Sequence, residues 1–198
     1  GVTETDLAEQ LKKIYRDLGA DGLSFEPLFA FGSNAASGHH WPDDTRLKPG
    51  DCILVDIGCT WEGYCSDMTR TFFYKNVTQH QQEVYHTVLK ANEEAEKAVT
   101  PGIPLSSLDQ IARGIITDKG YGSAFTHRLG HFIGLEDHEF GDVSSASADR
   151  AVPGNIFSIE PGVYLENDMG VRVEDLVLVT DHGHEILNHF SKELTVID

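Results

Sequence analysis

Apolar residues recur at helical spacing in three stretches of the chain. The first stripe consists of Leu7, Leu11, Ile14 and Leu18. Because Thr3 can cap this stretch and Gly19 can end it, we predict a helix over residues 3–18. Two later amphipathic stretches, bounded by proline, glycine or a capping threonine, predict helices over residues 78–99 and 105–118.

Shorter apolar runs predict β-strands. Residues 52–57 and 67–73 flank a turn at residues 62–63, which predicts an antiparallel hairpin. Further runs predict strands over residues 155–160 and 171–180. Strands at both ends of the chain with helices between them predict an α+β domain, in which helices cover one face of a mostly antiparallel sheet.

Charge and composition narrow the classes of partner. The chain of 198 residues has 15 Lys and Arg against 32 Asp and Glu, a formal net charge of −17, and 40% of its residues are hydrophobic. These values fit one domain with its own core and argue against nucleic-acid or anionic membrane partners. Without a membrane-spanning apolar run, a signal-peptide pattern or a disulfide framework among Cys52, Cys59 and Cys65, we expect a cytoplasmic protein.

Four carboxylates interrupt or end the apolar runs. Asp56 and Asp67 lie on the two arms of the predicted hairpin, where they can lie opposite each other on one face. Glu160 and Glu174 lie at the ends of the later runs, 14 positions apart across a predicted hairpin that contains Asn167 and Gly170. Each acid alone is explained by a turn cap or an ion pair, such as Asp67 with Arg70. Four together indicate a cation held between like charges.

Histidines supply the second part of this pattern. His127, His131 and His138 lie in a segment where Gly130 and Gly134 leave room for a ligand near the backbone. A single histidine is more often a hydrogen-bonded polar residue than a ligand, but three in so short a segment weaken that interpretation.

Four carboxylates and one imidazole form a hard ligand set that suits two divalent ions. The carboxylates contribute −4 and the ions +4, and Mn²⁺ or Co²⁺ fits such ligands better than a structural zinc does, with Zn and Fe as alternatives. Two-metal sites hold their ions about 3.5–4 Å apart and activate a bridging water as hydroxide. The pattern therefore predicts metal-assisted hydrolysis.

Five ordered motifs, DIG, SDMTRTF, HRLGHFIG, EPGVY and GVRVED, resemble those of the pita-bread metallopeptidases. This family includes methionine aminopeptidase, aminopeptidase P and prolidase, and the resemblance covers about residues 1–190. It implies the pita-bread (creatinase/aminopeptidase) fold, a curved and mostly antiparallel sheet covered by helices. It also implies that the five metal ligands are Asp56, Asp67, His131, Glu160 and Glu174.

The resemblance implies a role for each site residue. Asp67 and Glu174 would bridge both metals, Asp56 would complete one site, and His131 with Glu160 the other. Glu160 would also relay the proton of the attacking water to the leaving amine.

Four further residues match family positions around the substrate. His138 would stabilise the tetrahedral intermediate. His39, rather than His40, has the spacing of a substrate-positioning histidine, and Arg172 would bond the acids of the site, the alternative being a charge on the strand surface. His127, four residues before the ligand histidine, is typical of the proline-directed members.

The predicted activity is hydrolysis of the bond preceding proline, by a Xaa-Pro dipeptidase or a Xaa-Pro aminopeptidase. Its substrate would be a small peptide with proline at the second position. The segments SGHHW and HEFGD depart from the family pattern, which leaves open a pita-bread hydrolase of a small non-peptide amide. A non-catalytic binding module is the remaining alternative, against which the retained ligands argue.

The chain begins at a helix that corresponds to GVTE in the family. We therefore expect residues 1–198 to be the catalytic domain of a longer protein, with the preceding family helix and an N-terminal domain absent from this chain. Such proteins are expected to form homodimers.

Overall fold

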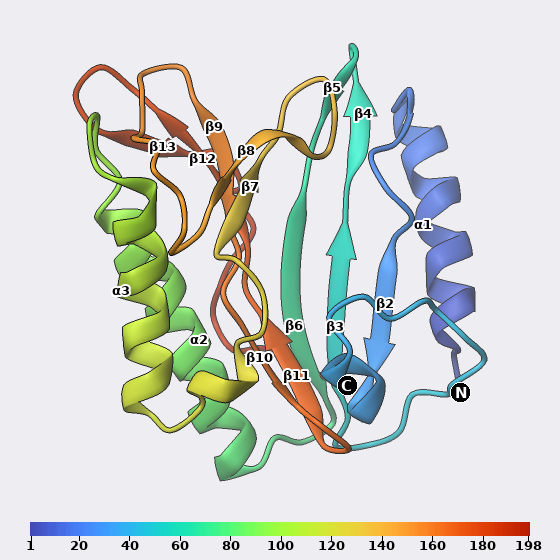
Figure 1. Cartoon of the computed structure of the whole chain (residues 1–198). Coiled ribbons are helices and arrows are strands. Elements are labelled where there is room, and N and C mark those ends of the chain that lie inside the picture. The colour runs from blue at the N-terminus through green and yellow to red at the C-terminus, as the bar shows by residue number, and fades with distance from the viewer.

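In the computed structural model, which describes all of residues 1–198, curved sheets stand between one helix on one flank and two on the other (Figure 1). The helices are α1 (Glu4–Leu18), α2 (Gln79–Lys97) and α3 (Leu105–Asp118), with short 3-10 turns η1 (Gly32–Ala36) and η2 (Gly122–Ala124). None of them combines the length and the hydrophobicity that crossing a membrane requires.

Fourteen strands form four sheets, and every pairing is antiparallel except that of β14 with β6. The strands are β1 (Gly22–Leu23), β2 (Leu28–Phe31), β3 (Cys52–Ile57), β4 (Cys59–Trp61), β5 (Tyr64–Cys65), β6 (Met68–Tyr74), β7 (Gly130–Phe132), β8 (Glu139–Val143), β9 (Ile156–Ile159), β10 (Gly162–Leu165), β11 (Met169–Arg172), β12 (Asp175–Val179), β13 (His184–Ile186) and β14 (Val196–Ile197). The α+β class and the curved, mostly antiparallel sheet arrangement are thereby confirmed.

The sequence signals at the ends of α1 are confirmed by its caps. Thr3 and Asp6 form a reciprocal capping box, and Gly19 ends the helix in the left-handed conformation, with φ 87°. The buried face of α1 packs Ala8 and Leu11 against Phe29 of β2. This small cluster fixes α1 on the outer face of the β2–β3 pair.

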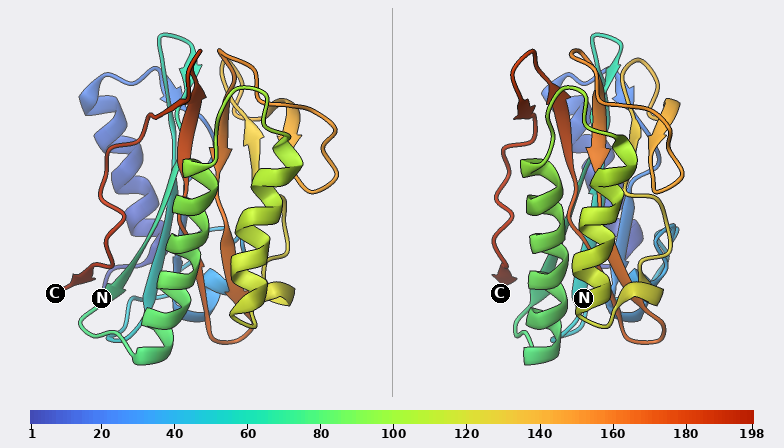
Figure 2. Two further views of the ribbon diagram at one scale, coloured as in Figure 1. Left: turned by 90° about the vertical axis from the view of Figure 1, so that its left-hand side faces the viewer. Right: turned by 60° about the vertical axis from the view of Figure 1, so that its left-hand side comes forward.

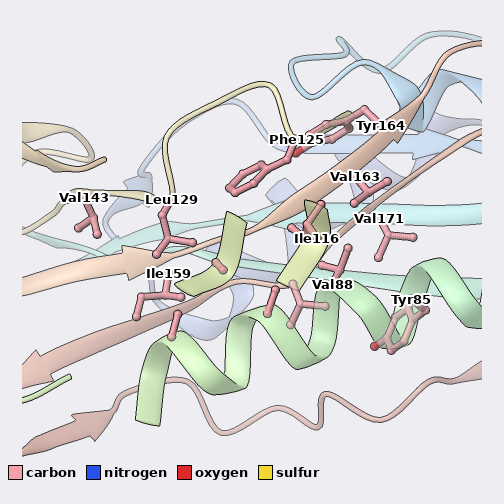
Figure 3. Close-up of a cluster of buried hydrophobic side chains, with 14 of the residues drawn as sticks. Tyr85, Val88, Ile116, Phe125, Leu129, Val143, Ile159, Val163, Tyr164 and Val171 are labelled. Atoms are coloured by element: carbon pink, nitrogen blue, oxygen red, sulfur yellow. The ribbon is translucent and has the colours of Figure 1, made fainter. Parts of the chain in front are cut away.

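The other face of the same strands belongs to the main core, where α2 and α3 pack side by side (Figure 2). Val88 of α2 and Ile116 of α3 lie among the side chains of β9, β10 and β11, as Figure 3 shows. Leu54 of β3 and Phe73 of β6 are fully buried in this cluster. Strand alternation thus gives β3 one face for each core.

The hairpin prediction was wrong in its register. Asp56 pairs with Thr69 in the β3–β6 ladder, and Asp67 lies just before β6, so the two aspartates are not cross-strand partners. Gly58 allows the break because a Cβ there would clash with the carbonyl oxygen of Ser66. The ladder then continues as the short β4–β5 hairpin, whose turn at 62–63 was predicted correctly.

The predicted strand over 171–180 is divided into β11 and β12. The predicted hairpin between Glu160 and Glu174 is confirmed and is formed by β10 and β11. Asn167, with φ 61°, lies in the turn between them. Glu174 occupies the break between β11 and β12, while Glu160 directly follows β9. The breaks place both glutamates outside regular strands.

Residues 190–192, near the C-terminus, are held against the sheets by hydrogen bonds and an ion pair. The guanidinium of Arg70 donates to the carbonyl oxygens of Phe190 and Ser191 and to Asp175 Oδ1, at 2.8, 3.2 and 2.6 Å. Lys192 Nζ lies 2.9 Å from Asp175 Oδ2. Because Arg70 and Asp175 are buried, this cluster holds the segment against β6 and β12.

Replacing Arg70 by methionine should lower the free energy of unfolding by about 3–5 kcal/mol, because it leaves part of a buried charge cluster without its partner. Urea denaturation of metal-free protein measures the change. The matched control is Lys97→Met, which removes an exposed pair with Glu94 and should change stability little. Equal effects of the two substitutions would contradict the assigned role of Arg70.

Candidate metal centre and active site

The five residues expected to bind metal come from separate segments and meet in one cavity of about 420 Å³. Asp56 belongs to β3 and His131 to β7, while Asp67, Glu160 and Glu174 stand at strand ends. All five side chains line this cavity. The cavity therefore brings together residues that are up to 118 positions apart, from Asp56 to Glu174.

His131 lies between two of the carboxylates. Its Nε2 is 3.4 Å from Asp67 Oδ2 and 3.6 Å from Glu160 Oε1. Ligand atoms of Asp67, His131 and Glu174 lie within 4.8 Å of one another, and all three residues are buried. The Nδ1 of His131 is 3.2 Å from the Phe132 carbonyl oxygen, which orients the ring so that Nε2 can face the carboxylates.

Two buried oxygen atoms show that divalent cations fit these residues. Oδ1 of Asp56 and Oδ1 of Asp67 have no hydrogen-bond partner. Buried carboxylate oxygens normally have partners, and an unpaired one is costly. Four carboxylates with one imidazole form an oxygen-rich donor set suited to hard divalent ions. Geometry and donor chemistry therefore agree with a metal centre, and its ions would supply the missing positive charge.

Repulsion between negatively charged carboxylates dominates the electrostatics of the cavity. Burial, followed by the charge of Glu174, raises the pKa of Glu160 to about 8. Burial and the charge of Asp56 raise the pKa of Glu174 to about 8, and burial with the charges of Glu174 and Asp56 also raises that of Asp67. Without cations, the site favours protonated acids.

Arg172 connects the acids through a buried network. Its guanidinium donates to Asp56 Oδ2 at 2.6 Å and to Thr69 Oγ1 at 3.0 Å. Thr69 Oγ1 in turn donates to Glu174 Oε2 at 2.6 Å. Arg172 is buried and points into the site, so the alternative of a strand-surface charge is wrong.

His127 is held as a neutral ring. Its Nδ1 lies 2.7 Å from the Arg128 carbonyl oxygen, which requires Nδ1–H as donor and leaves Nε2 as acceptor for the Tyr164 hydroxyl at 2.9 Å. Tyr164 then accepts from Arg172 at 2.8 Å. Burial and the charge of Arg172 lower the pKa of His127 to about 4, in agreement with this tautomer.

The remaining predicted histidines lie at the cavity in different ways. The ring of His138 packs on that of His131 with centroids 4.1 Å apart, and 60% of its side chain is exposed. His39 lines the cavity. His40 also reaches the cavity wall, but its Nε2 lies 2.7 Å from Oε2 of the buried Glu4, which anchors the loop that carries both histidines.

Sequence reasoning missed four residues that act on this site: Glu4, Thr69, Asp137 and Tyr164. Thr69 and Tyr164 stand inside the quoted motifs SDMTRTF and EPGVY, so a signal for them was present. Glu4 stands in the quoted segment GVTE, but nothing in the sequence distinguishes Glu4 or Asp137 from the many other acids of this chain.

This fold and these carboxylates define the class of metal-dependent hydrolases with a pita-bread fold. The model of metallopeptidase family M24 matches residues 1–181. An uncharacterized peptidase of Staphylococcus aureus (strain MW2) is 45% identical over 192 residues, which are 97% of this chain and 55% of the relative. The chain belongs to metallopeptidase family M24, and it spans about half the length of the curated relatives that it matches.

Solved structures agree with this assignment. A prolidase from Thermococcus sibiricus matches with a TM-score of 0.97 and 39% identity, over 100% of this chain and 54% of its own. An X-Pro aminopeptidase from Thermotoga maritima MSB8 matches with a TM-score of 0.97 and 37% identity, over 100% of this chain and 56% of its own. The expected family and fold are thereby confirmed.

The metal-free protein should become less stable as pH rises from about 4.5 to about 8. The folded-state pKa of Glu160, about 8, exceeds the ordinary value of 4.5, so the folded state binds more protons than the unfolded state in this range. We predict that Glu160→Gln stabilises the EDTA-treated protein at pH 8 and changes its stability little at pH 5. Urea unfolding at both values measures this, and an equal effect at both would contradict it.

Proposed function

We propose that this protein hydrolyses the peptide bond that precedes proline, using two divalent metal ions. The observation that carries the proposal is the meeting of four carboxylates and one buried histidine in a single cavity, with two carboxylate oxygens unpaired. Prolidases and X-Pro aminopeptidases among the similar structures support the substrate class.

The expected ligands are Asp67 and Glu174 to both ions, Asp56 to one, and His131 with Glu160 to the other. Mn²⁺ or Co²⁺ suits this donor set, with Zn and Fe as alternatives. When bound, the ions would supply Lewis acidity for the scissile carbonyl and an acidified water as nucleophile. The surrounding Arg172–Thr69 network keeps Asp56 and Glu174 in position for binding.

Protein groups would perform the remaining steps. Glu160 takes the proton of the attacking water and gives it to the proline nitrogen as the bond breaks, a role that suits a carboxyl beside the site's histidine. His138 would donate to the developing oxyanion, and His39 would position the substrate carbonyl. Both roles need side chains that line the cavity, as these do.

The surroundings of His127 suit a proline ring. Its imidazole packs edge-on to Phe125 with centroids 5.1 Å apart and lies 5.5 Å from the Tyr164 ring. A neutral histidine between aromatic rings offers an apolar wall without an uncompensated charge. Arg128 also lines the cavity and makes no ion pair with a carboxylate of the chain, so its guanidinium is available for the carboxylate of a dipeptide.

We further propose that residues 1–198 are the catalytic domain of a longer cytoplasmic homodimer. Relatives about twice as long support the first part, and three free cysteines suit a reducing compartment.

A second candidate is hydrolysis of a small non-peptide amide. It is favoured by SGHHW, because the cavity wall includes His39, His40 and Trp41 from this segment. The metal centre would be the same, so the substrate distinguishes the two functions.

The test is an activity panel on the purified protein with Mn²⁺. We expect cleavage of Met-Pro and of peptides that begin Met-Pro, and at least about tenfold lower kcat/KM for Met-Ala, because proline contacts are lost. The ratio of Met-Pro to Met-Pro-Ala activity distinguishes a dipeptidase from an aminopeptidase.

The control variant is Glu160→Gln, which should lower kcat by about 100-fold or more. Turnover of an ectoine-type ring amide without cleavage of any Xaa-Pro peptide would select the second candidate. No hydrolysis of either substrate class by metal-loaded, folded protein would select the non-catalytic alternative.

A further inference from the structure

Asp137 is a carboxylate of the active-site cavity that the proposed reaction leaves without a role. It stands between β7 and β8, and its side chain lines the same cavity as the expected metal ligands. The exposed fraction of its side chain is 16%, compared with 18% for Asp56 and 16% for Glu160. It therefore opens to the cavity about as far as those two carboxylates do.

Asp137 lies outside the group of expected metal ligands. The ligand histidine, His131, lies within 4.0 Å of carboxylate oxygens of Asp67 and Glu160 but not of Asp137. Its side-chain partner is His138, whose Nδ1 is 3.0 Å from Asp137 Oδ2. A further carboxylate is thus present beside the metal centre without joining it.

The chain provides no lysine or arginine for this carboxylate. His138 is the only basic side chain within 4.0 Å of it, and Oδ1 of Asp137 is buried without a hydrogen-bond partner. Arg172, the buried cation of the cavity, is bonded to Asp56 instead. Burial is the main cause that raises the pKa of Asp137, and the nearby charge of His131 offsets this rise only in part. A cation that arrives with the substrate would offset the remaining cost of the buried charge.

Aromatic surface lies in the same cavity. Phe25 and Trp41 line its wall, and 71% of Trp41 is exposed. Aromatic faces attract ammonium and guanidinium groups and also cover the aliphatic stems of lysine and arginine. Carboxylate and aromatic rings together form suitable surroundings for a long basic side chain.

Building on the proposed function, we propose that Asp137 binds the basic side chain of the residue that precedes proline, so that Lys-Pro and Arg-Pro are preferred substrates. Asp137 is then a specificity-determining residue rather than a metal ligand. In the proposed function, the neutral cavity wall at His127 accepts the proline ring.

The test compares Lys-Pro with norleucyl-proline, whose side chain has nearly the same length and no charge. Kinetic constants are measured with Mn²⁺ for the native protein, Asp137→Asn and Glu136→Gln. The last is the matched control, because it removes an exposed carboxylate one position away that does not line the cavity. Inhibition by free lysine against free norleucine gives a second, binding readout.

We expect the native protein to favour Lys-Pro by about 10- to 100-fold in kcat/KM, as for a charged hydrogen bond. Asp137→Asn should lose most of this preference, chiefly through KM, while norleucyl-proline changes less than about threefold. Lysine should inhibit the native protein more strongly than norleucine does, and Asp137→Asn should remove that difference. Glu136→Gln should leave all these ratios unchanged.

Other outcomes overturn the proposal. An equal rise in KM for both substrates in Asp137→Asn would assign the carboxylate to the substrate's α-ammonium group. An equal fall in kcat would reduce Asp137 to orienting His138. Cleavage of norleucyl-proline by native protein without a preference for lysine would overturn this proposal alone, whereas failure to cleave any Xaa-Pro dipeptide would also overturn the proposed function.

Discussion

Mutual repulsion among buried carboxylates is the constraint on which the structure of this site depends. Asp56, Asp67, Glu160 and Glu174 meet in one cavity, where burial and neighbouring charge raise the pKa values of the last three. Such a cluster opposes folding unless cations or protons compensate it. In the proposed function, the binding of divalent ions would stabilise this arrangement, and the charge of those ions would promote hydrolysis.

The surrounding residues keep the four acids close together despite their mutual repulsion. Arg172 and Thr69 bond Asp56 and Glu174 from within the site. On the far side, Arg70 donates to the backbone carbonyl oxygens of Thr69 and Glu174, which ties the two strands beneath the ligands together. Asn188 donates to the carbonyl oxygen of Asp67, so the last segment of the chain also supports the centre. These hydrogen bonds hold the acids in position against their mutual repulsion.

Local sequence signals predicted an element well where its boundaries depend only on residues that are close together in the chain. The capping boxes at Thr3 and Thr78 place the starts of α1 and α2, since both depend on residues three positions apart. The register of the β3–β6 hairpin was not predictable in this way, because it depends on the break at Gly58. Two-residue strands such as β1 and β14 carry no periodic signal at all.

The difference between local signals and long-range contacts also decides which residues of the site could be predicted. Ordered motifs were enough to select residues that meet in one cavity, because the family resemblance carries long-range information. Thr69 and Glu174 stand 105 positions apart, and nothing in the local pattern around either indicates their hydrogen bond. Glu4 is likewise typical of a first helical turn, although it is fully buried and anchors His40. Such contacts come from tertiary packing and require the structure.

Metal content is the most direct test of the central claim that the acids form a two-ion centre. Elemental analysis after dialysis against Mn²⁺ should find about two ions per chain in the native protein and in Glu136→Gln. Asp67→Asn, which alters a ligand expected to bridge both ions, should lose most of that metal while it remains folded. Folded native protein without bound metal, or full occupancy in Asp67→Asn, would contradict the account.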